Sequence, residues 1–142
     1  MKKMTQLKKL NKTMATIIIT LVANFLLAGC SSESPSDLTK VWLDAVVNKD
    51  KETIAKYLIF PSLSPEEELL RIDYVVEKLT EDELWEYEIK GEFISANKES
   101  AIVTVIVTTE RDIKRDRDGE RGKIFWVKTK NEGWKIDAEK MH

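Results

Sequence analysis

The spacing of apolar residues changes in the middle of this chain, and that change restricts the fold more than any single motif. As far as Leu79, apolar side chains recur every three or four residues, which is the period of an α-helix. From Leu84 they alternate with charged residues, which is the period of a β-strand. Helices followed by strands joined through short turns predict an α+β domain in which the helices cover one face of an antiparallel sheet.

Three helices are expected in the first half of the domain. The first covers residues 38–46, where apolar side chains form one stripe, and Ser36 or Asp37 is expected to cap its start. A second, short helix is expected to begin after Asp50, which can cap it, with Ile54, Tyr57 and Leu58 directed inward.

The third helix has the clearest start signal. Ser64 can cap it, Pro65 occupies the first helical position, and Glu67 follows at the third. We expect this helix to run to about residue 79 and to bury one stripe of five side chains. These are Leu69, Ile72, Val75, Val76 and Leu79.

Four antiparallel strands are expected to follow, so the predicted fold is three N-terminal helices packed on a curved four-stranded sheet. Asp118 and Gly119 predict the turn of a long hairpin. The expected strands cover residues 84–93, 101–109, 123–130 and 134–137.

Two of these strands carry apolar residues on both faces. Val103 and Val105 alternate with Ile102 and Ile106, and Ile124 and Trp126 alternate with Phe125 and Val127. Because the helices can cover only one face, the other is expected to meet a second copy of the chain, an envelope protein or the lipid surface.

The amino terminus carries a separate signal. Five lysines lie within residues 1–13 without an acidic residue, and the uncharged run 14–28 follows, which is short for a transmembrane span of about 20 residues. It ends in Leu27, Ala28, Gly29 and Cys30, which resembles the lipobox of bacterial lipoproteins. The resemblance implies cleavage between Gly29 and Cys30 and acylation of Cys30, the only cysteine in the chain.

The expected organisation follows from this cleavage. Residues 1–29 are expected to be a signal peptide, residues 30–36 the lipidated cysteine and a tether, and residues 37–142 the folded domain. Loss of five lysines from a chain of net charge −2 leaves a net charge of −7, which argues against nucleic-acid binding and against electrostatic attraction to anionic lipid. The expected location is the extracytoplasmic face of the bacterial cell membrane, held there by the lipid on Cys30.

The helix-then-sheet order carries a resemblance of its own. Residues 42–50 (WLDAVVNKD) lie early in the domain and residues 133–137 (GWKID) lie at its end. With this pattern the chain resembles the nuclear-transport-factor-like (NTF2-like), cystatin-like cone superfamily, and more closely its lumazine-binding-related lipoprotein domains of unassigned activity. The resemblance implies a cone-shaped cavity that binds a small apolar molecule, holds isomerase or dehydratase chemistry, or is filled by side chains.

Aromatic residues are the candidate lining of that cavity, because aromatic walls with few polar groups suit small apolar ligands. The alternative is an ordinary aromatic core. The candidate lining residues are Trp42, Tyr57, Trp85, Tyr87, Phe93 and Trp126.

No catalytic motif is present in the sequence, so a non-catalytic domain that binds a ligand or a partner is expected. The first alternative is a small isomerase or dehydratase acting on an apolar substrate, for which Asp44 and Asp73 are the candidate bases. The second is an accessory structural subunit of a cell-envelope complex. The only histidine is the terminal His142, and neither a metal site nor a cofactor is expected.

Overall fold

The computed structural model describes residues 33–81 and 83–141, and the side chain of Trp85 is outside its description. The expected signal peptide, the lipobox and Cys30 therefore lie outside the described residues. Within the described part of the chain, no helix has both the length and the apolar composition needed to cross a bilayer.

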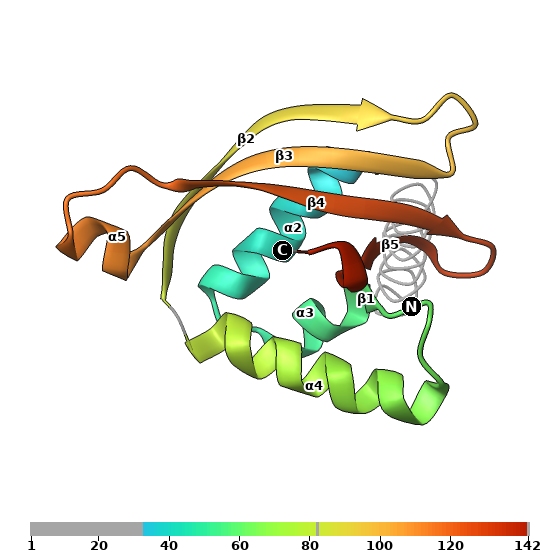
Figure 1. The fold of residues 1–142 in the computed structure, drawn as a ribbon. Coiled ribbons are helices and arrows are strands. Elements are labelled where there is room, and N and C mark those ends of the chain that lie inside the picture. Colours follow the sequence, from blue (N-terminus) through green and yellow to red (C-terminus); the bar gives the residue numbers. More distant parts are fainter. Residues whose placement is uncertain (1–32, 82, 142) are drawn as a thin grey trace, which may run out of the picture. The chain divides into compact units, whose positions relative to one another are not determined.

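The described chain forms an α+β domain with the expected order of helices before strands (Figure 1). The elements are α2 (Pro35–Val47), α3 (Lys51–Tyr57), β1 (Leu58–Ile59), α4 (Pro65–Glu81), β2 (Leu84–Ile94), β3 (Ser100–Thr109), α5 (Glu110–Lys114), β4 (Glu120–Thr129), β5 (Gly133–Asp137) and a final 3-10 turn, η1 (Ala138–Lys140).

The sheet differs from the expected one by an additional strand. Its order is β1-β5-β4-β3-β2, and β1 pairs in parallel with β5 whereas all other neighbours are antiparallel. The expectation of four antiparallel strands was therefore wrong in this detail, and the sheet is five-stranded and mixed. A strand of two residues shows no alternation of its own, and it forms only because Leu58 and Ile59 lie beside Ile136 and Asp137.

The hairpin between β3 and β4 also differs from the expected tight turn at Asp118 and Gly119. The chain instead forms the short helix α5 after β3 and returns through a connection to β4. Thr109 begins α5 with a reciprocal cap, because its hydroxyl accepts a hydrogen bond from the Asp112 N–H and the Asp112 carboxylate accepts one from the Thr109 N–H. This local cap stabilises a helical turn where the sequence indicated only a reversal.

The starts of the long helices follow from their caps. Ser34, rather than Ser36 or Asp37, caps α2, and Asp37 completes the reciprocal cap from the third helical position. Asp50 caps α3 as expected. At α4 the Ser64 N–H and hydroxyl both donate to the Glu67 carboxylate, which agrees with the expected start at Pro65.

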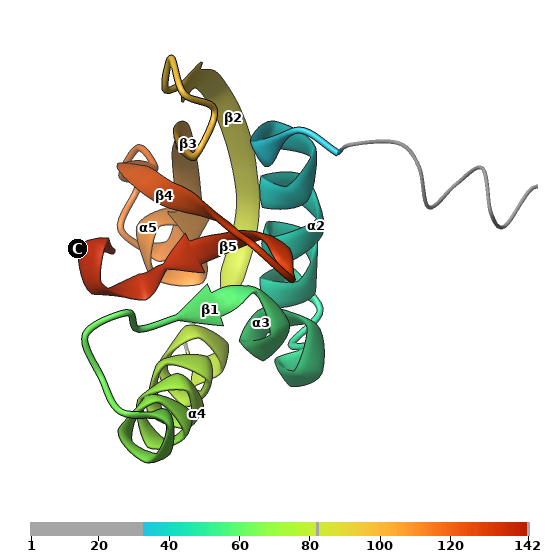
Figure 2. The same cartoon turned by 90° about the vertical axis from the view of Figure 1, so that its right-hand side faces the viewer.

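The helices cover one side of the sheet, which we call the inner face (Figure 2). α2 packs on β2 and β3, while α4 packs chiefly on α3. The inner face of β3 and β4 is buried, and its residues are Ala101, Val103, Val105, Ile124 and Trp126.

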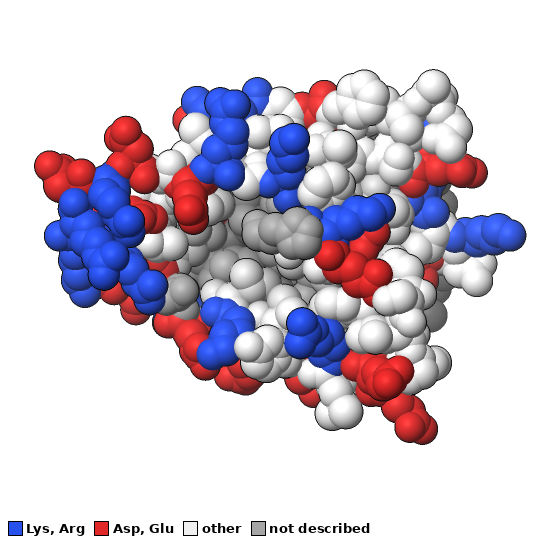
Figure 3. All heavy atoms as spheres, in the orientation of Figure 1, with Lys and Arg blue, Asp and Glu red and all other residues white. Residues whose placement is uncertain are grey.

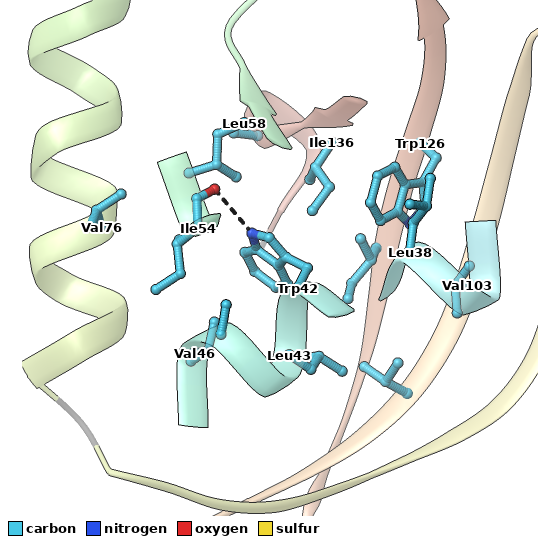
Figure 4. Close-up of a cluster of buried hydrophobic side chains, with 14 of the residues drawn as sticks. Leu38, Trp42, Leu43, Val46, Ile54, Leu58, Val76, Val103, Trp126 and Ile136 are labelled. Atoms are coloured by element: carbon cyan, nitrogen blue, oxygen red, sulfur yellow. Dashed lines mark hydrogen bonds between the residues drawn. The ribbon is translucent and has the colours of Figure 1, made fainter. Parts of the chain in front are cut away.

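Two tryptophans join α2 to the rest of the core. The Trp42 indole N–H donates to the Ile54 carbonyl oxygen at 3.2 Å (Figure 4), and the Trp126 indole N–H donates to the Thr39 hydroxyl at 2.9 Å. Each buried indole thus has the hydrogen-bond partner that its N–H requires. The first bond joins α2 to α3 and the second joins α2 to β4, so together they fix the position of α2 and define the space beside it.

Candidate functional site

A cavity of about 290 Å³ lies between the inner face of the sheet and the helices α2 and α4. It is more enclosed than a second, wider hollow beside α4. Nine of its lining residues are apolar: Trp42, Leu43, Val46, Leu79, Leu84, Val105, Val107, Ile124 and Met141. The others are Lys78, Thr109, Gly122 and Lys123.

The cavity exists in part because Gly122 has no side chain. On β4 the buried side chains of Trp126 and Ile124 occupy alternate positions, so the next inward position belongs to Gly122, opposite Val105. A Cβ atom placed on Gly122 would meet only the Val105 Cγ2 atom within 4 Å, at 3.8 Å. The missing side chain leaves this part of the inner face unfilled.

The chemistry of the described lining is that of an apolar binding site. No aspartate, glutamate or histidine occurs among the described residues that line it. Lys78 is half exposed and pairs with Glu81 at 2.7 Å, and the Thr109 hydroxyl is engaged by Asp112. Because these polar groups already have partners, the cavity would select a ligand by its shape and by hydrophobic contact.

The two candidate bases lie elsewhere. Asp73 is exposed on α4 and does not line the cavity. Tyr57, a candidate lining residue, packs against Trp126 instead. Asp44 is exposed on α2 and accepts a hydrogen bond from the Tyr87 hydroxyl. Across the described residues, no three acidic, histidine or cysteine side chains come together as a possible metal site.

Tyr87 therefore connects β2 to α2. Its hydroxyl lies 2.5 Å from Asp44 Oδ1 and 3.3 Å from the Lys40 carbonyl oxygen. Burial of the phenol, together with the hydrogen bond to the Asp44 carboxylate and its negative charge, raises the pKa of Tyr87 to about 12. The pair holds the open edge of the sheet against the helix, outside the cavity.

The aromatic residues that the sequence suggested as cavity lining lie in several parts of the domain. Trp42 does line the cavity, as expected. Trp126 and Tyr57 pack edge to face in the core, with ring centroids 5.9 Å apart, and Phe93 is 67% exposed. The side chain of Trp85 lies outside the description, as does His142.

Sequence reasoning missed the aliphatic lining from α2, β2 and β3 and the role of Gly122. Leu43, Val46 and Val107 carry no signal that separates a cavity wall from a packed core. Gly122 does carry one, because a glycine at an inward position of a strand often marks a place where something else approaches the backbone.

The second hollow is a wider groove of about 880 Å³ between α4 and the end of the chain. The surface between α4 and the sheet is visibly hollowed, with lysine and arginine side chains at its margins (Figure 3). The lining residues of the groove are Phe60, Ser62, Leu63, Glu67, Leu70, Arg71, Tyr74, Ala138, Glu139 and Met141. It is more open and more highly charged than the inner cavity, so it encloses an apolar ligand less completely.

Comparison with known proteins supports the architecture. No protein-family model matches the sequence, and no curated protein matches it. A crystal structure from Campylobacter jejuni, described as a candidate NTF2-like transpeptidase, matches with a TM-score of 0.54 at 20% sequence identity. The match covers 73% of this chain and 97% of the other.

The chain has an NTF2-like fold. The resemblance inferred from the order of helices and strands is confirmed at this level. At 20% identity the likeness concerns the NTF2-like fold alone. The narrower resemblance to lumazine-binding-related lipoproteins stays a prediction.

Proposed function

We propose that this protein is a lipid-anchored protein of the extracytoplasmic membrane face, whose NTF2-like domain binds a small apolar molecule without transforming it. The observation that carries the binding function is the apolar cavity between the helices α2 and α4 and the inner face of the sheet, with unfilled space at Gly122. A binding function needs only this enclosure, whereas an isomerase needs a carboxylate facing the space. Asp73, the residue suggested for that role, is exposed.

The size of the cavity limits the ligand. Its 290 Å³ is about twice the ~150 Å³ of an apolar cavity that holds benzene, so a compact ligand on the order of ten heavy atoms fits. An aromatic or branched aliphatic body would contact Trp42 and the aliphatic side chains around it. Such a ligand stabilises the folded state in proportion to the logarithm of its concentration.

Native mass spectrometry of the detergent-extracted protein tests this function. We expect the wild type to retain a small molecule and Gly122→Leu to lose it, because the new side chain occupies the cavity. Gly91→Leu is the matched control: its Cβ has no neighbour within 4 Å, and Gly91 is exposed and does not line the cavity. A wild type that carries no molecule and gains no thermal stability from apolar ligands would contradict the binding function.

The proposed lipid anchor at the membrane is tested separately. In Cys30→Ala the acyl acceptor is lost, so we expect an unprocessed precursor without incorporated fatty acid. A wild-type protein that begins at Met1 and carries no acyl group would contradict the address.

A second candidate function is self-association through the outer face of the sheet, opposite the helices. Ile102, Ile106, Phe125 and Val127 lie on that face and are only half buried. In register with Ile106 are Glu88 on β2 and Arg121 on β4. A twofold axis parallel to the strands would place β2 of one copy over β4 of the other, so each Glu88 would meet an Arg121.

This association predicts a dimer that charge substitutions break. Ile106→Lys combined with Val127→Lys should leave the circular dichroism spectrum unchanged and convert the dimer into a monomer in sedimentation. A wild type that sediments as a monomer with no bound partner would contradict this candidate function.

A further inference from the structure

Two adjacent apolar residues at the end of β2 are exposed to solvent. Phe93 is 67% exposed and Ile94 is 40% exposed. Phe93 pairs with Ile102 at the edge of the sheet, and Ile94 pairs with Ala101 beside the turn that leads into β3. Consecutive residues of a strand point to opposite faces, so Phe93 lies on the outer face with Ile102, and Ile94 lies on the inner face with Ala101. The two exposed apolar side chains therefore flank the end of this edge strand, and we ask what that end meets other than water.

The same end of β2 is fixed to the start of α2. The Ser36 backbone N–H donates to Glu92 Oε1 at 2.7 Å, and Glu92 immediately precedes Phe93. The reach of a glutamate side chain plus one Cα–Cα step places Phe93 within about 12 Å of Ser36. Figure 2 shows the start of α2 and the β2–β3 turn at the same end of the domain.

The length of the tether determines what lies near this end. From Cys30 to Ser34, the residue that caps α2, the chain advances by four residues and spans at most about 14 Å. If Cys30 carries the diacylglycerol of the proposed function, on which this inference rests, the bilayer surface lies within that reach of Ser34. The end of β2, with Phe93 on one face and Ile94 on the other, is then close to the headgroups.

We propose that Phe93 and Ile94 enter the interfacial layer of the membrane and orient the domain on it. The lipid on Cys30 holds the protein at the bilayer, so this contact needs only to select one orientation. An apolar contact suits a domain whose net charge is −7 after removal of the five signal lysines, because it requires no attraction to anionic headgroups. Side chains of this kind are favoured in the boundary between headgroups and acyl chains.

The chain offers a clean labelling experiment. Cys30 is the only cysteine, and acylation consumes its thiol, so a cysteine introduced elsewhere is the one reactive site. A fluorophore is attached to Phe93→Cys in the mature, lipidated protein. The matched control is Ile113→Cys, because Ile113 is 47% exposed on α5, at the other end of the long strands (Figure 1).

Both labelled proteins are reconstituted into phosphatidylcholine vesicles with and without brominated acyl chains. At position 93 we expect quenching by aqueous iodide to be at least threefold lower than at position 113, and we expect brominated lipid to quench the label. At position 113 we expect full quenching by iodide and none by brominated lipid. Fatty-acid labelling of Cys30 is measured on the same samples.

The outcomes distinguish failure of the membrane contact at Phe93 from failure of the proposed lipid anchor at Cys30. Equal iodide access at positions 93 and 113 in an acylated protein would overturn the membrane contact and leave the anchor in place. Protection from iodide without quenching by brominated lipid would mean that protein covers Phe93, which also overturns it. A Cys30 without fatty acid would instead overturn the proposed address.

Discussion

The helices α2 and α4 have similar apolar spacing in the sequence but different surroundings in the fold. α2 has 13 residues and buries seven of them, whereas α4 has 17 residues and buries two. On α4, Leu69 and Leu70 are 67% and 73% exposed, although Leu69 was expected to be buried. The comparison teaches that periodicity identifies a helix, while the partner surface decides how much of its stripe is buried.

The two helices meet different partners. α2 lies along the inner face of the sheet and packs on β2 and β3, so most of its stripe is buried, although Val41 at its edge is 42% exposed. α4 packs chiefly on the seven-residue helix α3, which is too short to cover five turns. Val76 is buried, but the apolar residues of the first turns extend past the contact.

The largest difference between the helices should appear on truncation of a core side chain. Trp42→Ala on α2 is expected to lower the free energy of unfolding by about 3–5 kcal/mol, because it enlarges the cavity and removes the hydrogen bond to Ile54. Val76→Ala on α4 should cost about 1–2 kcal/mol. Urea unfolding measures both, and equal costs would mean that α4 shares the core as fully as α2.

A smaller difference is expected for the polar contacts of the two helices. Tyr87→Phe removes the hydrogen bond to Asp44 on α2 and should cost about 1–2 kcal/mol. Glu77→Gln removes the exposed ion pair between α4 and Lys51 and should cost less than about 1 kcal/mol.

The tyrosine contact also predicts a pH dependence. The pKa of Tyr87 is raised from 10.0 to about 12 in the folded state, so its contribution is complete below pH 10 and is lost as the pH rises toward 12. Ultraviolet titration should show one of the three tyrosines ionising late, and this late step should be missing in Tyr87→Phe. Three tyrosines that ionise together near pH 10 would contradict the strength of this contact.

The smallest effect is expected at the exposed start of α4. Leu70→Ser should change the free energy of unfolding by no more than about 0.5 kcal/mol, because the side chain is already largely in water. Leu43→Ser on α2, at 3% exposure, is the buried counterpart and should be strongly destabilising. Chemical denaturation of the two variants completes the comparison, and a large loss in Leu70→Ser would indicate a partner on α4.

Much of the fold could be predicted from local chemistry. The change of period near Leu84, the cap at Asp50 and the start signal at Ser64 depend on neighbouring residues, and each has its counterpart in the structure. These features are short-range, so a single sequence carries them.

Features that depend on distant residues could not be predicted. β1 exists because Leu58 lies beside Ile136, far along the chain, and Leu69 is exposed because α3 ends before reaching it. The cavity likewise depends on how α2, α4 and the sheet approach one another, and only the inward position of Gly122 left a trace in the sequence.

The irregular pairing of β2 has a consequence for encounters between folded molecules. β2 is an outermost strand of 11 residues, and its register shifts between Leu84 and Glu86 and again between Ile89 and Gly91. A straight, continuous edge of this length would be a template on which neighbouring molecules could add their own strands. The two register shifts bend the strand and interrupt its row of backbone donors and acceptors, so neighbouring molecules find no continuous template for fibril growth.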